Sequence, residues 1–147
     1  MRLSRFAATS AVLLAALLTV PAGSARASGE FPVDQLMLLD APPIQKVKRM
    51  PALTVGGNGL GTLELWCRAV EVRVQLSGVA IRIETAPLPE ALPQYMSSGQ
   101  CSAERVQADN DLVQVLAQAE QWQRQGDRVL LSAPGWPRPI PFRLSSH

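Results

Sequence analysis

The fold is decided by residues 62–85, which read TLELWCRAVEVRVQLSGVAIRIET. Apolar and polar residues alternate along this stretch, first over residues 70–76 and again over residues 79–84. Because successive side chains of a β-strand point to opposite faces, a period of two places the apolar residues on one face. Ser77-Gly78 separates the two runs. The pattern predicts an antiparallel hairpin with one buried face and one solvent-exposed face.

Two registers are compatible with this hairpin. A two-residue turn at Ser77-Gly78 would place Arg73 opposite Arg82, which is unfavourable directly across a strand pair. A shift by two residues, with a four-residue turn, would place Arg73 opposite Glu84 and would keep the apolar face intact. The sequence leaves both registers open.

One helix is predicted after the hairpin, over residues 103–125. Ser102 can cap its N-terminus, Glu104 lies in the first turn, where the helix dipole favours an acid, and Gly126 follows its end. Apolar residues recur at helical spacing, namely Val106, Leu112, Val113, Leu116, Ala119 and Trp122. The helix would be amphipathic and would pack along one face.

Further strands are expected on both sides of these elements. Residues 28–52 contain four prolines and one short apolar piece at 36–39, so they predict an extended N-terminal arm with one strand. A glycine cluster indicates a turn between strands, at Gly56, Gly57, Gly59 and Gly61. Residues 129–131 and 140–144 are typical of a second hairpin.

These elements together predict an α+β domain over residues 53–147. We expect a curved antiparallel β-sheet, or a partly open barrel, with one amphipathic helix packed on it.

Residues 1–27 are typical of a secretory signal peptide. Arg2 and Arg5 precede an apolar stretch over residues 7–20, Pro21 breaks it, and cleavage is expected after Ala27. The alternative is a membrane anchor, but this run is shorter than the roughly 20 residues that a spanning helix needs. No later part of the sequence is long and apolar enough to span, so we expect the mature chain in the bacterial periplasm, or secreted. We also expect it to be a monomer.

The basic charge of the chain belongs to this leader. The full sequence has 14 basic and 12 acidic residues, and removing Arg2, Arg5 and Arg26 leaves 11 basic against 12 acidic, a net charge of −1. A protein that binds nucleic acid electrostatically needs a surplus of Lys and Arg on its folded domain. We therefore expect no nucleic-acid partner.

The two cysteines, Cys67 and Cys101, are interpreted through this location. An even number of cysteines in an exported chain favours a disulfide, which would stabilise the fold by roughly 3 to 4 kcal/mol in the chain-entropy model. Two buried free thiols are the alternative.

The sequence resembles the META domain family, the HslJ-like bacterial envelope proteins, over about 80 residues. The matching positions are Ser97, Cys101, Asp109, Leu112 and Leu116, then Gly126-Asp127, residues 129–131 and Phe142, with Trp66-Cys67-Arg68 upstream. Arg68 departs from the family, which usually has Asn after the upstream Cys. The resemblance implies a compact β-rich fold with one helix, in an exported protein tied to envelope stress.

The residues argue against an enzyme. The one histidine, His147, ends the sequence, so Ser or Cys nucleophiles lack the usual base and a zinc site lacks ligands. We expect no catalytic residue, metal or cofactor. Trp136 lies in the turn Pro134-Gly135-Trp136-Pro137, where it either folds back over the sheet or serves as an exposed aromatic contact for a partner.

Two functions follow from these expectations. The first is a non-enzymatic periplasmic accessory protein that acts through contact with an unknown envelope protein. The alternative is a carrier or pilotin-like protein that holds an apolar ligand or partner peptide inside a cracked barrel. A carrier needs an unfilled apolar cavity with an entrance, whereas the accessory protein should have a filled core.

Overall fold

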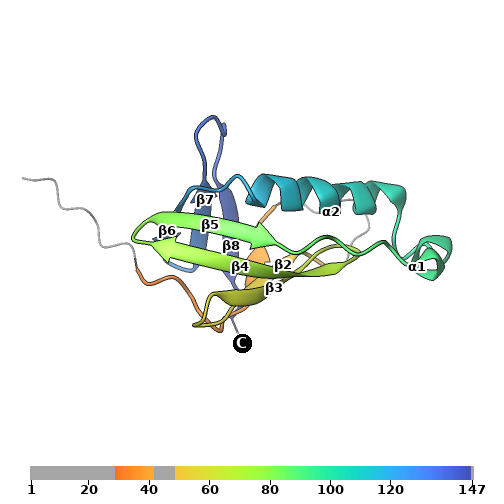
Figure 1. Ribbon diagram of the computed structural model, residues 1–147, viewed down its shortest axis with the longest axis horizontal. Coiled ribbons are helices and arrows are strands. Elements are labelled where there is room, and N and C mark those ends of the chain that lie inside the picture. Colours follow the sequence, from red (N-terminus) through yellow and green to blue (C-terminus); the bar gives the residue numbers. More distant parts are fainter. Residues whose placement is uncertain (1–28, 42–48, 147) are drawn as a thin grey trace, which may run out of the picture.

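The computed structural model describes residues 29–41 and 49–146. Eight antiparallel strands follow one another around a closed ring in chain order (Figure 1). Their bounds are β1 Met37–Leu39, β2 Ala52–Val55, β3 Leu60–Glu64, β4 Ala69–Ser77, β5 Ala80–Thr85, β6 Gln121–Gln125, β7 Arg128–Ser132 and β8 Ile140–Leu144. The predicted leader and part of the arm, residues 42–48, lie outside the described residues.

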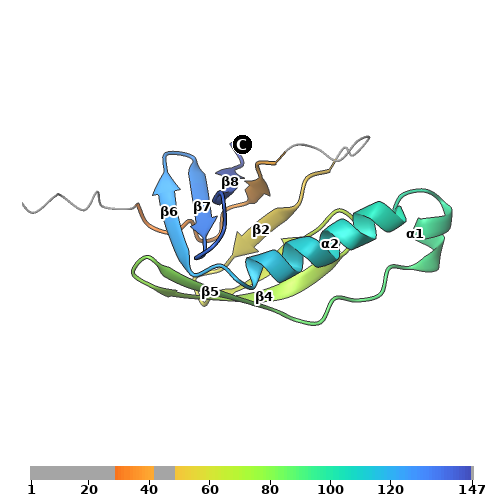
Figure 2. The ribbon, with the colours of Figure 1, turned by 90° about the horizontal axis from the view of Figure 1, so that it is seen from above.

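Two short helices lie between β5 and β6, α1 over Pro93–Ser97 and α2 over Ala103–Leu116. Figure 2 shows α2 alongside β4 and β5, with α1 at the end remote from β6, β7 and β8. The expected α+β fold with one amphipathic helix is therefore wrong. The described chain is a β-rich closed barrel to which two short helices are added.

The predicted helix over residues 103–125 is too long, because its last part is a strand. This is one reason why the predicted fold class is wrong. The helix begins as expected, because the Ser102 hydroxyl accepts a hydrogen bond from the Arg105 amide, but it ends at Leu116. Residues 121–125 form β6, where Trp122 is buried between exposed glutamines and lies opposite Leu131 of β7. Leu116, Ala119 and Trp122 recur at helical spacing, but Trp122 is the one apolar residue of Gln121–Gln125, so pairing with β7 outweighs this weak local pattern.

The central hairpin has the second of the two predicted registers. Arg73 lies opposite Glu84, and Ser77 lies opposite Ala80. The turn itself is shorter than expected, because it holds two residues, Gly78 and Val79, with Gly78 at φ 59°. A left-handed first turn residue is the conformation that glycine adopts without strain, which explains why the chain reverses here.

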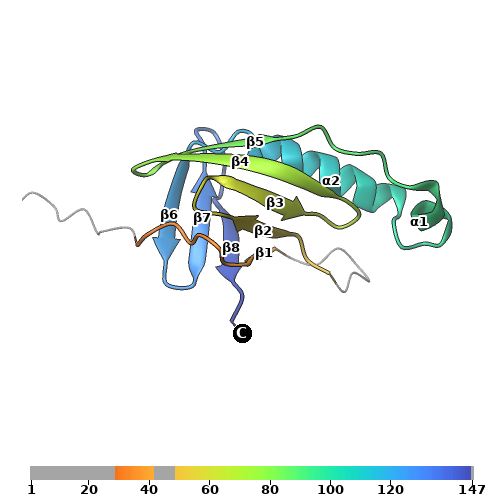
Figure 3. The same cartoon turned by 60° about the horizontal axis from the view of Figure 1, so that its bottom comes forward.

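The ring closes through β1, which pairs with β2 on one side and with β8 on the other (Figure 3). The described part of the predicted arm thus contributes a strand to the barrel, and its Phe31 packs edge-on against Trp122 with ring centroids 5.2 Å apart. β2 begins at Ala52, so it crosses the predicted boundary between arm and domain. The thinnest seam is between β5 and β6, which share one paired position, Ala80 with Gln121.

Side chains fill the barrel interior. The inward-facing residues of all eight strands form one hydrophobic cluster, and α2 adds Leu112 and Leu116 to it. The strand residues of this cluster are Met37, Leu39, Leu53, Val55, Leu63, Val70, Val72, Val74, Ile81, Ile83, Trp122, Val129, Leu131 and Phe142. This packing is what holds the short strands together, because burial of each such side chain contributes roughly 1.5 to 3 kcal/mol.

Three glycines of the predicted cluster, Gly56, Gly57 and Gly59, lie in the turn between β2 and β3, as predicted, whereas Gly61 lies in β3, close against β2. A Cβ on Gly61 would overlap the carbonyl oxygen of Thr54 in the paired strand, whereas a Cβ on Gly57 would meet no atom within 4 Å. Gly61→Ala should therefore lower the free energy of unfolding by roughly 1 to 3 kcal/mol, and Gly57→Ala should change it by less than about 0.5 kcal/mol. Urea unfolding of both variants measures this, and equal effects would contradict the close approach.

Candidate functional site

The connection between β3 and β4, residues 65–68, brings the chemistry-bearing residues together at one end of the barrel. It is a tight turn in which the Leu65 amide donates to the Arg68 carbonyl at 2.7 Å. Leu65 is fully buried and anchors the turn in the core. Trp66, Cys67 and Arg68 consequently lie against the first half of α2.

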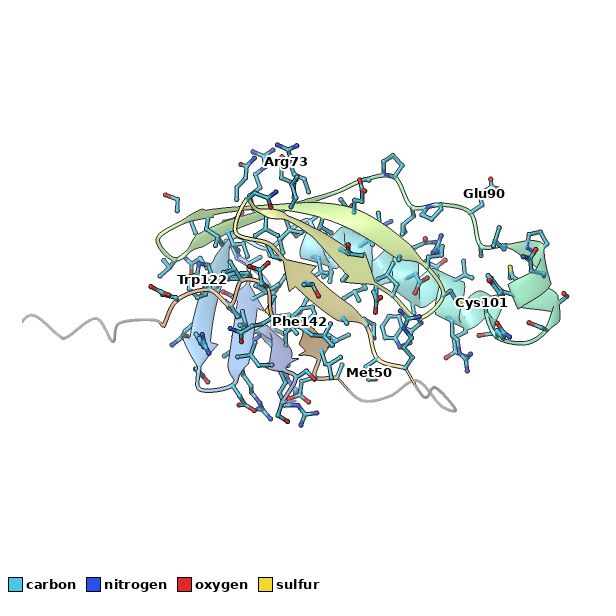
Figure 4. All side chains as sticks on the ribbon, turned by 90° about the horizontal axis from the view of Figure 1, so that it is seen from below. Met50, Arg73, Glu90, Cys101, Trp122 and Phe142 are labelled. Atoms are coloured by element: carbon cyan, nitrogen blue, oxygen red, sulfur yellow. A yellow bond between two sulfur atoms is a disulfide. The ribbon has the colours of Figure 1, made fainter. Side chains whose placement is uncertain are left out.

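The two cysteines form a disulfide that joins this turn to the start of α2, with 5.5 Å between their Cα atoms. The predicted pairing is confirmed, and neither cysteine is a free thiol. Figure 4 shows Cys101 at the end of the molecule that carries α1, away from Trp122 and Phe142. A crosslink across 34 positions stabilises the fold by about 4 kcal/mol in the chain-entropy model.

A buried ion pair lies directly beside the disulfide. Arg68 Nε donates to Asp109 Oδ2 of α2 at 3.1 Å, and the two side chains are 9% and 0% exposed. The amides of Trp66 and Cys67 donate to the same carboxylate, at 2.9 Å to Oδ1 and 3.3 Å to Oδ2. These donors replace part of the hydration that the carboxylate loses on burial.

The rest of the Arg68 guanidinium is also satisfied. Nη2 donates to the Val106 carbonyl at 2.9 Å and to Asn110 Oδ1 at 2.8 Å, and Nη1 donates to the Pro89 carbonyl at 3.2 Å. One side chain thus connects the turn, α2 and the segment that leads to α1. Lysine has no planar fork of donors and could not make these contacts together.

Burial has the largest effect on the acid of this pair. It raises the pKa of the Asp109 carboxyl above its ordinary value of 3.8, against the lowering effects of the Arg68 guanidinium and of the Trp66 and Cys67 amides. The charged form is disfavoured because the site has lost its water. The ion pair therefore links residues 65–68 to α2, but part of its attraction is offset by the cost of removing both charged groups from water.

This pKa shift predicts how stability depends on pH. Because the pKa of Asp109 is higher in the folded chain, the folded state retains the proton after the unfolded state has lost it. Stability should therefore fall, relative to Asp109→Asn, as pH rises from about 4 through the folded pKa, by at most about 1.4 kcal/mol per pH unit. Chemical unfolding of both proteins between pH 3 and pH 7 measures the difference, and a rise over that window would contradict the shift.

The α1 segment, residues 89–101, projects beyond this end of the barrel (Figure 1). α1 buries none of its residues. Three large apolar side chains are exposed on it or next to it, Leu92 by 48%, Tyr95 by 42% and Met96 by 41%. A hollow of about 420 Å³ separates Tyr95 from the turn, and its walls include Arg49, Trp66, Gln100 and both cysteines.

Trp136 lies elsewhere, in the connection between β7 and β8. Its ring is partly buried and packs against the hydrophobic cluster. The backbone amide donates to the Ala133 carbonyl at 3.2 Å, and the indole Nε1 lies 3.5 Å from Gln118 Oε1. Trp136 therefore folds back over the barrel, and a partner contact through it stays a prediction.

Other predicted features give no competing site. His147 lies outside the described residues. Within residues 29–41 and 49–146, no group of three or more His, Cys, Asp or Glu side chains could hold a metal ion. In the same part of the chain no helix has the length and apolar character to cross a membrane.

The sequence analysis named Arg68 and Asp109 but missed that they pair. Asp109 appeared only as a position of the META resemblance, and Arg68 only as a departure from it. The available signal was that Asp109 lies within three residues of Leu112, on the buried side of the predicted helix. An acid on an apolar face requires a donor, and Arg68 is the residue that supplies it.

Comparisons with known proteins show the fold and no more. No protein-family model matches the sequence, and no curated protein matches it. The structure is similar to the crystal structure of a DUF4847 family protein from Bacteroides vulgatus, with a TM-score of 0.50 and 17% sequence identity. The likeness covers 66% of this chain, which spans 60% of that protein. The META resemblance is not tested by these matches and stays a prediction.

Proposed function

We propose that this chain is a non-enzymatic accessory protein of the bacterial envelope that acts by binding another protein. The leader-like residues 1–27 and the pair of cysteines support export to the periplasm, because disulfides persist in oxidising compartments. The resemblance to META domain proteins agrees with an envelope role. We further propose that the mature chain is a monomer that carries no metal or cofactor.

The observation that carries the proposal is the exposed apolar surface of the α1 segment. Leu92, Tyr95 and Met96 are each more than two-fifths exposed on a projection whose helix buries nothing. Apolar side chains that cluster on a projection, away from the core, are a recurrent mark of a protein-binding surface. Tyr and Met are also among the residues enriched in interfaces.

The carrier alternative has weaker support. A carrier would hold its apolar ligand between α2 and the sheet, but Leu112 and Leu116 of α2 pack there against the strand residues, and Leu63, Leu65 and Leu116 are completely buried. A ligand in that place would have to displace these side chains. The filled interior therefore favours contact through the outer surface.

A site-specific crosslink tests the proposal. A photoreactive amino acid in place of Met96 should give a discrete crosslinked product in the periplasm, because this position lies on the proposed surface. The matched control is Leu60 on β3, which is 48% exposed but lies at the opposite end of that strand from residues 65–68. Position 60 should not give the same product, and mass spectrometry of the crosslinked species identifies the partner.

The α1 surface can also be removed without touching the core. Leu92→Ser with Tyr95→Ser should reduce the crosslink from position 96 by about tenfold, while unfolding changes by less than about 0.5 kcal/mol for each exposed site. The same product from positions 96 and 60, or a product that survives the double substitution, would refute the proposal.

A further inference from the structure

We infer that the Cys67–Cys101 disulfide is a reducible clasp that holds the α1 segment in place, and that a dithiol reductant opens it through the adjoining hollow. The effect of reduction on binding rests on the proposed function, because the α1 segment carries the surface that we propose for partner binding. Reduction would change how this surface is presented without unfolding the barrel.

The α1 segment is attached to the barrel at its two ends. At one end Leu88 packs on the hydrophobic cluster and the Pro89 carbonyl accepts from Arg68 Nη1. At the other end Cys101 is bonded to Cys67. Loss of the disulfide therefore leaves the second end without its direct bond to residues 65–68, so that it is held only through α2, into which it continues.

Between these ends the segment bonds mainly to itself. The Tyr95 amide donates to the Leu92 carbonyl at 2.9 Å, and the Cys101 amide donates to the Tyr95 carbonyl at 3.0 Å. Gln100 accepts from Arg105 of α2. The side-chain hydrogen bonds of Ser97 and Ser98 also go to carbonyls within the segment. Local bonds of this kind shape α1 but do not fix its position.

The disulfide can be reached from solvent. Both cysteines line the hollow of about 420 Å³ together with Tyr95 and Gln100. Cys101 is 5% exposed, whereas Cys67 is more open. The more open residue, Cys67, is therefore the one at which we place the attack of an incoming thiolate.

The exchange balances with a dithiol as the only co-reactant. Its thiolate attacks Cys67 Sγ and forms a mixed disulfide, while the bond between the cysteines breaks and Cys101 leaves as a thiolate with the electron pair. The second thiol of the reductant then closes its own disulfide and releases Cys67. The dithiol gives up two protons to water in these steps, and the two cysteine thiolates take up two protons from water.

The position of Cys101 favours this direction of attack. Cys101 directly precedes Ser102, the N-cap of α2, so its sulfur lies near the positive end of a 14-residue helix. That end stabilises a thiolate and makes Cys101 the better leaving group. The Arg49 guanidinium lines the same hollow, but it is paired with the Glu64 carboxylate at 2.8 Å, so the effect on the thiolate is assigned to the helix end.

The barrel and α2 have other attachments, which keep the change local. α2 remains joined to residues 65–68 through the Arg68–Asp109 pair, and Leu112 and Leu116 remain in the core. The strands keep their ring of hydrogen bonds. Reduction should therefore release residues 90–101 and leave β4 and β5 unchanged.

Hydrogen exchange measured by mass spectrometry tests the release. Oxidised protein is compared with dithiothreitol-reduced protein and with the double variant Cys67→Ala, Cys101→Ala. Amides of residues 90–101 should exchange at least about tenfold faster in both reduced and variant protein, with β4 and β5 within about twofold. Unchanged exchange in residues 90–101, or loss of protection throughout the strands, would overturn the inference.

Access is tested separately by the rate of reduction. Dithiothreitol should reduce the native protein within about tenfold of the rate in denaturant, since Cys67 opens to the hollow. Reduction that occurs only after unfolding would also overturn the inference.

Crosslinking from position 96 distinguishes this inference from the proposed function. The double cysteine variant should give about tenfold less product than the oxidised protein, because a released surface is no longer pre-organised. Equal product from both would overturn redox control but leave the proposed function standing. No product from either would refute the proposed function, and the exchange measurement would still decide whether the clasp opens.

Discussion

The buried pair of Arg68 and Asp109 is the constraint on which the site depends. A charged acid with no exposed surface has to be neutralised and hydrogen-bonded, and here the turn between β3 and β4 supplies both a guanidinium and two amides. This fixes α2 across the barrel and places Cys67 opposite Cys101. The covalent and the ionic contact therefore share one location, but they act on different parts: the ion pair holds α2, and the disulfide holds the α1 segment.

This division explains how a rigid barrel can carry a projecting surface. The strands close on themselves through β1 and β8, and the interior is filled, so the barrel has little freedom to move. The α1 segment buries none of its helix and is tied to residues 65–68 near its two ends. Its exposed apolar residues are thus held in one arrangement, which lowers the ordering cost of binding a partner.

The sequence predicts local features well where one period dominates. Alternation over residues 70–84 specifies β4 and β5, Ser102 specifies the start of α2, and the even pair of cysteines indicates the disulfide. The prediction fails at residues 117–125, because Ala119 and Trp122 continue the helical spacing of α2, and the pairing of residues 121–125 with β7 overrides that spacing. It also misses the pairing of Arg68 with Asp109, 41 positions apart, since no local pattern reports such a contact.

A double-mutant cycle on Arg68 and Asp109 tests the central claim most directly. We expect Asp109→Ala to lower the free energy of unfolding by about 3 to 5 kcal/mol, because it leaves a buried guanidinium unpaired. Asp111→Ala, on the exposed face of the same helix, should cost less than about 0.5 kcal/mol. The double variant Arg68→Ala, Asp109→Ala should cost at least about 2 kcal/mol less than the sum of the single changes. Additive costs, or an Asp109→Ala effect no larger than that of Asp111→Ala, would contradict the account.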